Sequence, residues 1–98
     1  MSSADALSGS AVPERARSMA WQTIDGETVL LDIDGRELMG INDSAARIWA
    51  LCDGTHTVDE IARAVAAEFA VDPAVAAADT RAFIDTLAKR GALTLSGA

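Results

Sequence analysis

Alanine is distributed unevenly along this chain of 98 residues, and the distribution constrains the fold more than any single motif. No alanine occurs between Trp21 and Ser44, whereas alanines recur from Ala45 to Ala92. Because alanine favours helices and is depleted in strands, the pattern predicts a β-rich segment followed by helices. A chain of this length forms one domain at most, which leaves no room for a deep, enclosed substrate cavity.

Two Asp-Gly pairs, Asp25-Gly26 and Asp34-Gly35, punctuate the alanine-free segment. Asp-Gly favours the type I′ turn of a tight hairpin, because both central residues of that turn take positive φ. Between the pairs, Val29, Leu31 and Ile33 alternate with the intervening residues and form one apolar face, as a strand requires. The predicted strands of this antiparallel meander cover residues 19–24, 27–33 and 36–41. The third has no later hairpin partner, so it should be a sheet edge with unpaired N–H and C=O groups.

Three helices are predicted next, each from its own start signal. Asn42 can cap the first helix, and Thr57 with Glu60 three residues later forms a capping box for the second. Asp72 precedes Pro73 at the start of the third, where the missing N–H of proline costs nothing.

The ends of these helices are also marked. Asp53-Gly54 ends the first, and Gly91 is a plausible C-cap of the third, after Lys89 and Arg90, which suit the negative end of a helix. Residues 92–95 form a final apolar segment that is expected to pack against the domain. The predicted order is therefore βββααα, an α+β fold with winged helix-turn-helix content, in which the three-stranded antiparallel sheet comes first. Residues 1–18, small and polar, are predicted to be a disordered tail, and residues 19–95 the folded domain.

Composition excludes several classes of function. Fifteen acidic against eight basic residues give a net charge of −7, which disfavours binding to nucleic acid. No segment has the length and hydropathy of a membrane span, and no hydrophobic signal core precedes the domain. A single cysteine, Cys52, precludes an intrachain disulfide and indicates the cytoplasm. Cys52 and His56 are spaced as metal ligands, but structural zinc needs four ligands, so we predict no metal. One His, one Cys and no Tyr also predict neither catalysis nor a cofactor.

Several segments together resemble the PqqD-like family, the small recognition elements for precursors of ribosomally synthesised, modified peptides. They are "ETVLLDIDGRELMGIND", "SAARIWALCDGTHTVDEIARAVAAEF" and "DTRAFIDTLAKRGAL", and the resemblance spans about residues 20–95. Its recognisable parts are the Asn42 start with Ile48 and Trp49, the helix-ending Asp53-Gly54, and the "TVDEI" that begins at Thr57. Positions often filled by Leu or Gly in the family are Ile41 and Ala46 here.

The resemblance implies a function as well as a fold. Members bind the leader of a precursor peptide and present it to a modifying enzyme, either a radical SAM enzyme, as in pyrroloquinoline quinone biosynthesis, or a leader peptidase. The leader is expected to lie as an added strand against the third strand, in a groove bounded by the third helix. The edge strand itself is read from this chain, and an extended peptide can pair with such an edge. The implied peptide-binding residues are Arg36, Glu37, Leu38, Met39, Gly40 and Ile41 on the strand, with Asp79, Ala82, Phe83, Thr86 and Arg90 on the helix.

Some of these residues have structural roles that compete with peptide binding. Met39 and Ile41 share one strand face, which favours core packing. Phe83 and Leu87 have the spacing of a buried helix face, and Arg90 suits the helix end. Gly40, in contrast, would let a peptide backbone approach closely.

Two other classes of function stay open as alternatives. A winged-helix DNA-binding regulator is the first, although residues 74–90 carry a net charge of only +1 from three basic and two acidic side chains. A carrier protein is the second, because Asp43-Ser44 resembles the Asp-Ser at which phosphopantetheine is attached. Ser44 is better explained as a first-turn residue near a helix cap. An unpaired edge strand also makes a homodimer possible.

Overall fold

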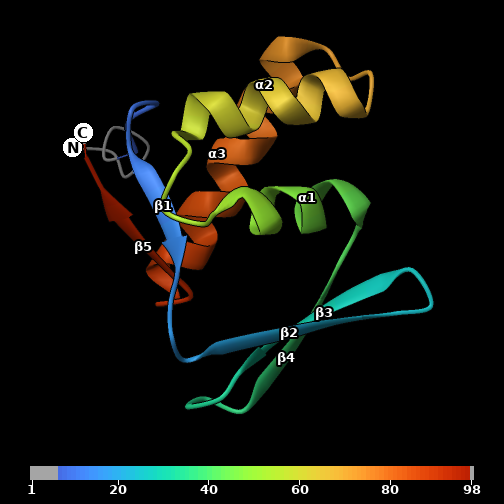
Figure 1. The fold of residues 1–98 in the computed structure, drawn as a ribbon, viewed down its shortest axis with the longest axis vertical. Coiled ribbons are helices and arrows are strands. Elements are labelled where there is room, and N and C mark those ends of the chain that lie inside the picture. Colours follow the sequence, from blue (N-terminus) through green and yellow to red (C-terminus); the bar gives the residue numbers. More distant parts are fainter. Residues whose placement is uncertain (1–6, 98) are drawn as a thin grey trace.

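The computed structural model describes residues 7–97, which fold into two small antiparallel sheets and three helices (Figure 1). The predicted α+β class is confirmed. The elements are β1 (Val12–Arg15), β2 (Met19–Ile24), β3 (Glu27–Asp32), β4 (Glu37–Ile41), α1 (Asp43–Leu51), α2 (Val58–Glu68), α3 (Pro73–Lys89) and β5 (Leu93–Ser96).

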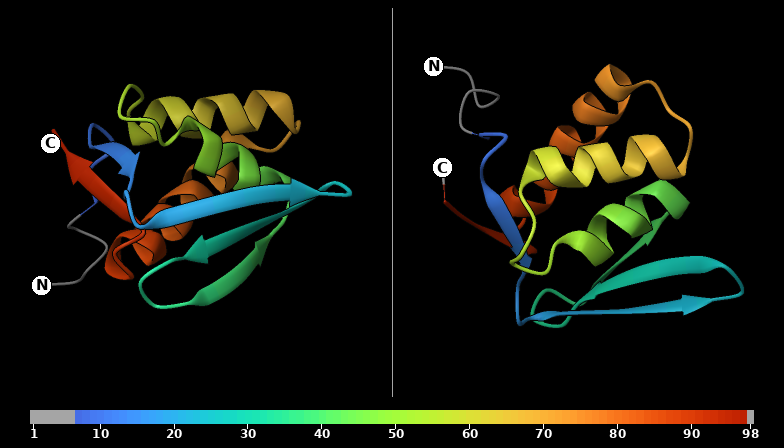
Figure 2. Two further views of the ribbon diagram at one scale, coloured as in Figure 1. Left: turned by 60° about the horizontal axis from the view of Figure 1, so that its bottom comes forward. Right: turned by 45° about the horizontal axis from the view of Figure 1, so that its top comes forward.

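Strands β2, β3 and β4 form the predicted meander, with β3 in the centre. Each begins and ends within one residue of the expected bounds. Helix α1 crosses one face of this sheet, and α2 and α3 pack behind α1 (Figures 1 and 2). Within the described part of the chain, β2 and β4 are the two edges of the sheet.

The two Asp-Gly turns differ in the structure. Asp25 and Gly26 have φ values of 52° and 81°, as the predicted type I′ turn requires. The second prediction was wrong, because Gly35 does not have a positive φ and Arg36, with φ of 56°, takes that conformation instead. The Asp32 carboxylate explains the longer loop, since Oδ1 accepts hydrogen bonds from the backbone N–H groups of residues 34 and 35, both at 3.1 Å.

The expectation of a disordered tail over residues 1–18 is wrong for residues 7–18, which belong to the fold; residues 1–6 lie outside the described residues. β1 pairs with β5 from Val12 opposite Ser96 to Arg15 opposite Leu93 (Figure 1). Leu7 is also buried in the core. Composition suggested disorder because the segment has few large apolar residues, yet its backbone hydrogen bonds are satisfied by distant partners.

Arg15, at the end of β1, joins three elements. Its guanidinium donates to the carbonyl oxygens of Trp49 and Ala50 at the end of α1, both at 2.9 Å. It also lies 4.8 Å from the ring centroid of Trp21 on β2. Trp21 in turn meets Trp49 edge-on, with centroids 5.6 Å apart. A cation at the negative end of a helix and over an aromatic face is stabilising in both contacts.

The helix caps follow the sequence signals. Asn42 Oδ1 accepts from the N–H of Ala45 at 2.9 Å, and Asp72 Oδ1 accepts from Ala74 at 2.9 Å. Thr57 and Glu60 form the predicted capping box.

The core lies between the sheet and the helices, and Trp49 is buried in it. On β3, however, Leu30 and Thr28 face the core. The continuous apolar row of Val29, Leu31 and Ile33 is on the outer face, where Ile33 is 54% exposed. No helix among residues 7–97 is both long and apolar enough to cross a membrane.

Candidate peptide-binding site

The free edge of β4 exposes the backbone of two residues, Leu38 and Gly40. In antiparallel pairing, backbone N–H and C=O groups point alternately to the two neighbouring strands. The N–H of Ile33 donates to Ser18 at 2.9 Å, just beyond β2, so the odd residues of β3 face β2 and the even ones face β4. The β4 residues opposite those even positions are residues 37, 39 and 41. The backbone groups of Leu38 and Gly40 therefore point to the open edge.

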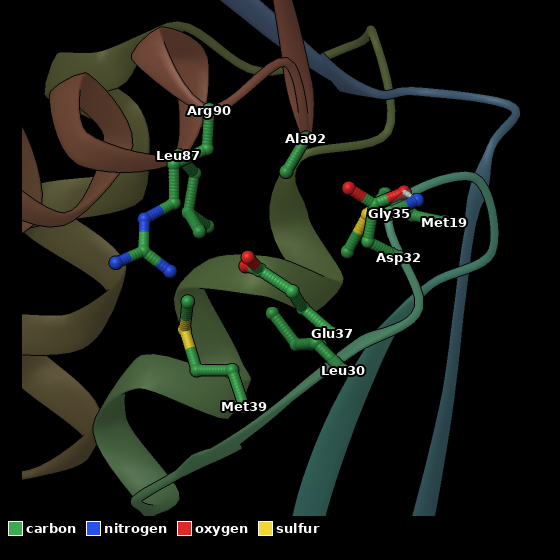
Figure 3. A pocket seen from close by; sticks show the side chains of 9 residues that line it. All are labelled: Met19, Leu30, Asp32, Gly35, Glu37, Met39, Leu87, Arg90 and Ala92. Carbon is green, nitrogen blue, oxygen red and sulfur yellow. Dashed lines mark hydrogen bonds between the residues drawn. The ribbon is translucent and has the colours of Figure 1, made fainter.

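A cavity of about 370 Å³ lies between the face of β4 that carries Glu37 and Met39 and the C-terminal end of α3 (Figure 3). Apolar and charged side chains both line it, and the charged ones come from β3, β4 and the C-cap of α3. The lining residues are Met19, Leu30, Asp32, Gly35, Glu37, Met39, Leu87, Arg90 and Ala92. We call this cavity and the adjacent β4 edge the groove.

The predicted strand residues divide between the two faces of the sheet. Glu37 and Met39 line the cavity, and Ile41 is half-buried against the core. Leu38, which is 72% exposed, lies on the outer face with Gly40. A Cβ added at Gly40 would meet no atom within 4 Å, so this glycine leaves open space on the outer face, away from the cavity. Arg36 is exposed in the preceding turn.

The predicted residues of α3 are spread along the helix, and only Arg90 lines the cavity. Asp79, Ala82 and Thr86 are exposed on the helix, farther from its C-terminal end. Phe83 is half-buried and packs against the core, as its competing structural role predicts.

The cavity also contains residues that sequence reasoning missed. Leu30 lies opposite Met39 in the sheet, and this pairing could have been found from the predicted hairpins. Leu87 was assigned to the core, where it is buried, but it also forms part of the cavity wall. Met19 and Ala92 reach the cavity only through tertiary packing, and no local sequence signal predicts that.

Opposite charges approach the cavity from its two walls. Asp32 and Glu37 are directly paired across β3 and β4, so both side chains are on the face of the sheet that lines the cavity. Arg90 faces them from the end of α3, and Figure 3 shows its guanidinium extending toward Met39. Neither Glu37 nor Arg90 forms an ion pair within residues 7–97.

The other chemically distinctive side chains lie away from the groove. Burial raises the pKa of the Cys52 thiol to about 12, and His56 Nε2 lies 3.8 Å from Asp53 Oδ2. Ser44 Oγ donates to the Asn42 cap at 3.1 Å, the structural role expected for it. In the described part of the chain, no three His, Cys, Asp or Glu side chains come together as a metal site would need.

Sequence comparison decides the family. The family model described as coenzyme PQQ synthesis protein D (PqqD) matches residues 27–93. The chain belongs to the PqqD family. The match begins at β3 and ends at the start of β5, so it includes both walls of the groove. A search of curated proteins gives no significant match.

Solved structures share the fold of this PqqD family member over most of its length. TbiB1, determined in complex with the TbiA(beta) leader peptide, is 30% identical with a TM-score of 0.72, over 82% of this chain and 93% of that chain. The PqqD truncation of Methylobacterium extorquens PqqCD, a stand-alone recognition element for ribosomally synthesised and modified peptides, is 28% identical with a TM-score of 0.76, over 95% and 99%. Lasso peptide synthetase B1, complexed with its leader peptide, has a TM-score of 0.75 at 24% identity over 85% and 98%, which shows the fold alone.

Proposed function

We propose that this protein is a noncatalytic module that binds the leader of a ribosomally synthesised precursor peptide and presents it to a modifying enzyme. The observation that carries the proposal is the free β4 edge beside the cavity. An extended peptide would pair with the backbone of Leu38 and Gly40 and place alternate side chains in the cavity. The solved complex of the 30% identical TbiB1 with a leader peptide supports this assignment.

The partner and the setting follow from the same proposal. The modifying enzyme would be a radical SAM enzyme or a leader peptidase, the two classes that the family resemblance implies. Because a leader is made by the ribosome, the module would act in the cytoplasm. A shallow groove open on one side suits a presenter, since the peptide must stay accessible to the enzyme.

The test removes one hydrogen-bond donor from the free edge. Leu38→Pro deletes an outward N–H that no strand among residues 7–97 uses, and proline is tolerated at such edge positions. Leu38→Ala keeps the N–H and serves as the matched control. Peptides selected from a random 12-residue display library on the wild-type protein provide the probes, and fluorescence anisotropy gives their Kd.

We expect Leu38→Pro to weaken peptide binding about five- to tenfold, because one hydrogen bond between the peptide and the β4 edge is lost. Leu38→Ala should bind the peptides as tightly as the wild type does. Circular dichroism confirms that both variants fold. Unchanged binding by a folded Leu38→Pro would contradict strand addition at β4. Tight, salt-sensitive binding to random duplex DNA would instead support the DNA-binding alternative.

A further inference from the structure

The groove combines apolar side chains with two charged ones, Glu37 and Arg90, that form no ion pair within residues 7–97. Met39, Leu30 and Leu87 provide the apolar surface, and Glu37 lies two residues before Met39 on the same face of β4. Figure 3 shows the Glu37 carboxylate pointing into the space beside these apolar side chains.

The carboxylates at this end of the groove favour a cation. Asp32 and Glu37 are directly opposite each other on neighbouring strands, an arrangement of like charges that destabilises a sheet. Asp32 Oδ1 is held by two backbone N–H groups of the following loop, whereas the Glu37 carboxylate has no hydrogen bond or ion pair within residues 7–97. A positive charge brought by a ligand would relieve this repulsion.

The register of an added strand determines which peptide residues would lie opposite Glu37 and Met39. Because Leu38 and Gly40 direct their backbone groups to the edge, Glu37 and Met39 would form the non-hydrogen-bonded pairs, whose side chains come closest across an antiparallel ladder. The peptide residues opposite Glu37 and Met39 would therefore be two positions apart, with both side chains on the groove face.

Resting on the proposed function, we infer that the groove selects a leader segment that carries a basic residue and a large apolar residue two positions apart. The basic side chain lies beside Glu37 and Asp32. The apolar side chain enters the cavity at Met39, where Arg90 extends over it from α3. The leader is thus recognised by one basic and one apolar side chain as well as by its backbone.

Selection of peptides against charge-reversed proteins tests the spacing. The random 12-residue library is selected in parallel on the wild type, on Glu37→Lys, and on Glu27→Lys. Glu27 is an exposed residue at the far end of β3, and its substitution changes the net charge by the same amount. We expect Lys or Arg two positions from a large apolar residue in the wild-type and Glu27→Lys pools, and Asp or Glu at that position in the Glu37→Lys pool.

Affinities then separate this inference from the proposed function. Reversing the basic residue of a selected peptide should weaken binding to the wild type about fivefold, as for a partly exposed charge pair, and restore it to Glu37→Lys. If the pools on wild type and Glu37→Lys carry the same pattern, the inference is wrong. If the selected peptides still bind Leu38→Pro more weakly than the wild type, the proposal of strand addition at β4 stands even though the spacing inference fails. If they bind both proteins equally, strand addition itself is contradicted.

Discussion

Cys52 shows how burial can set the chemistry of a side chain in this protein. Its thiol is fully buried at the end of α1. Burial raises its pKa from 9.0 to about 12, with a smaller raising effect from Asp53 and a lowering effect from Arg15. The thiolate is the nucleophilic form, so the native thiol should be inert at neutral pH.

The same pKa shift makes the stability of the fold depend on pH. Between the unfolded pKa of 9.0 and the folded value of about 12, the unfolded chain loses the Cys52 proton while the native protein keeps it. The free energy of unfolding should therefore fall as the pH rises above 9, by about 1.4 kcal/mol at one pH unit above the unfolded pKa.

Urea unfolding at pH 8 and pH 10 measures this loss, and Cys52→Ala supplies the control. The variant loses stability at both pH values through the cavity it creates, but it should lack the thiol's share of the decrease. Equal decreases in the two proteins would show that Cys52 does not titrate in this way. A thiol reagent at pH 8 should modify the native protein slowly and the urea-unfolded protein at once.

Among the elements, α2 begins where the sequence predicts because both halves of its capping box are local. Thr57 Oγ1 accepts from the Glu60 N–H at 3.1 Å, and Glu60 Oε1 accepts from the Thr57 N–H at 2.7 Å. The second contact is the main reason that the pKa of Glu60 lies below its ordinary value. Thr57→Ala should destabilise the protein by about 1 kcal/mol in thermal or urea unfolding.

Acid titration checks the other half of the box. Because the pKa of Glu60 is lowered in the folded state, its contribution is present above the unfolded pKa and is lost as the pH falls through the folded pKa. Glu60→Gln should therefore show a shallower loss of stability on acidification than the wild type. A variant that loses stability as steeply as the wild type would assign the acid sensitivity to other carboxylates.

The same distinction between local and distant partners explains which elements the sequence predicts. Caps and the first Asp-Gly turn involve residues within three positions of each other, so β2, β3 and the three helix starts were predicted closely. The pairing of β1 with β5 places Glu14 opposite Thr94. No local sequence pattern near either residue predicts this pairing. Period-two alternation located β3 but did not indicate which face is buried, since an apolar row occurs on the outer face as well.

The candidate site follows this pattern. Glu37 and Met39 were predicted because an edge strand is visible in the sequence, and Arg90 because the family resemblance implies a groove bounded by the third helix. The structure brings all three to one cavity. Met19 and Ala92 complete that cavity from elements whose positions depend on the packing of the whole chain. Their contribution could not be derived from periodicity or spacing.

At the scale of the whole molecule, the segment before β2 runs beside the helices and closes that side of the fold (Figure 1). Ala11 and Pro13 accept hydrogen bonds from the N–H groups of Val58 and Gly54, and Ala16 donates to Ala92, next to the groove. Arg15 N–H donates to Cys52 at 3.0 Å. β1 thus connects the ends of α1 and α3 with the start of α2.

A chain that begins at Met19 should therefore be much less stable than the full chain. It loses the four backbone hydrogen bonds just described and the whole β1–β5 ladder, and at about 1 kcal/mol for each bond the four alone amount to about 4 kcal/mol. Urea unfolding of the two chains measures the difference, and Glu14→Ala, an exposed change on β1 that leaves its backbone in place, should stay within about 0.5 kcal/mol of the full chain. Equal urea midpoints for the full and shortened chains would mean that residues before Met19 are dispensable. Because Ala92 lines the cavity and Ala16 holds its carbonyl, the shortened chain should also bind the selected peptides more weakly under conditions where it is still folded.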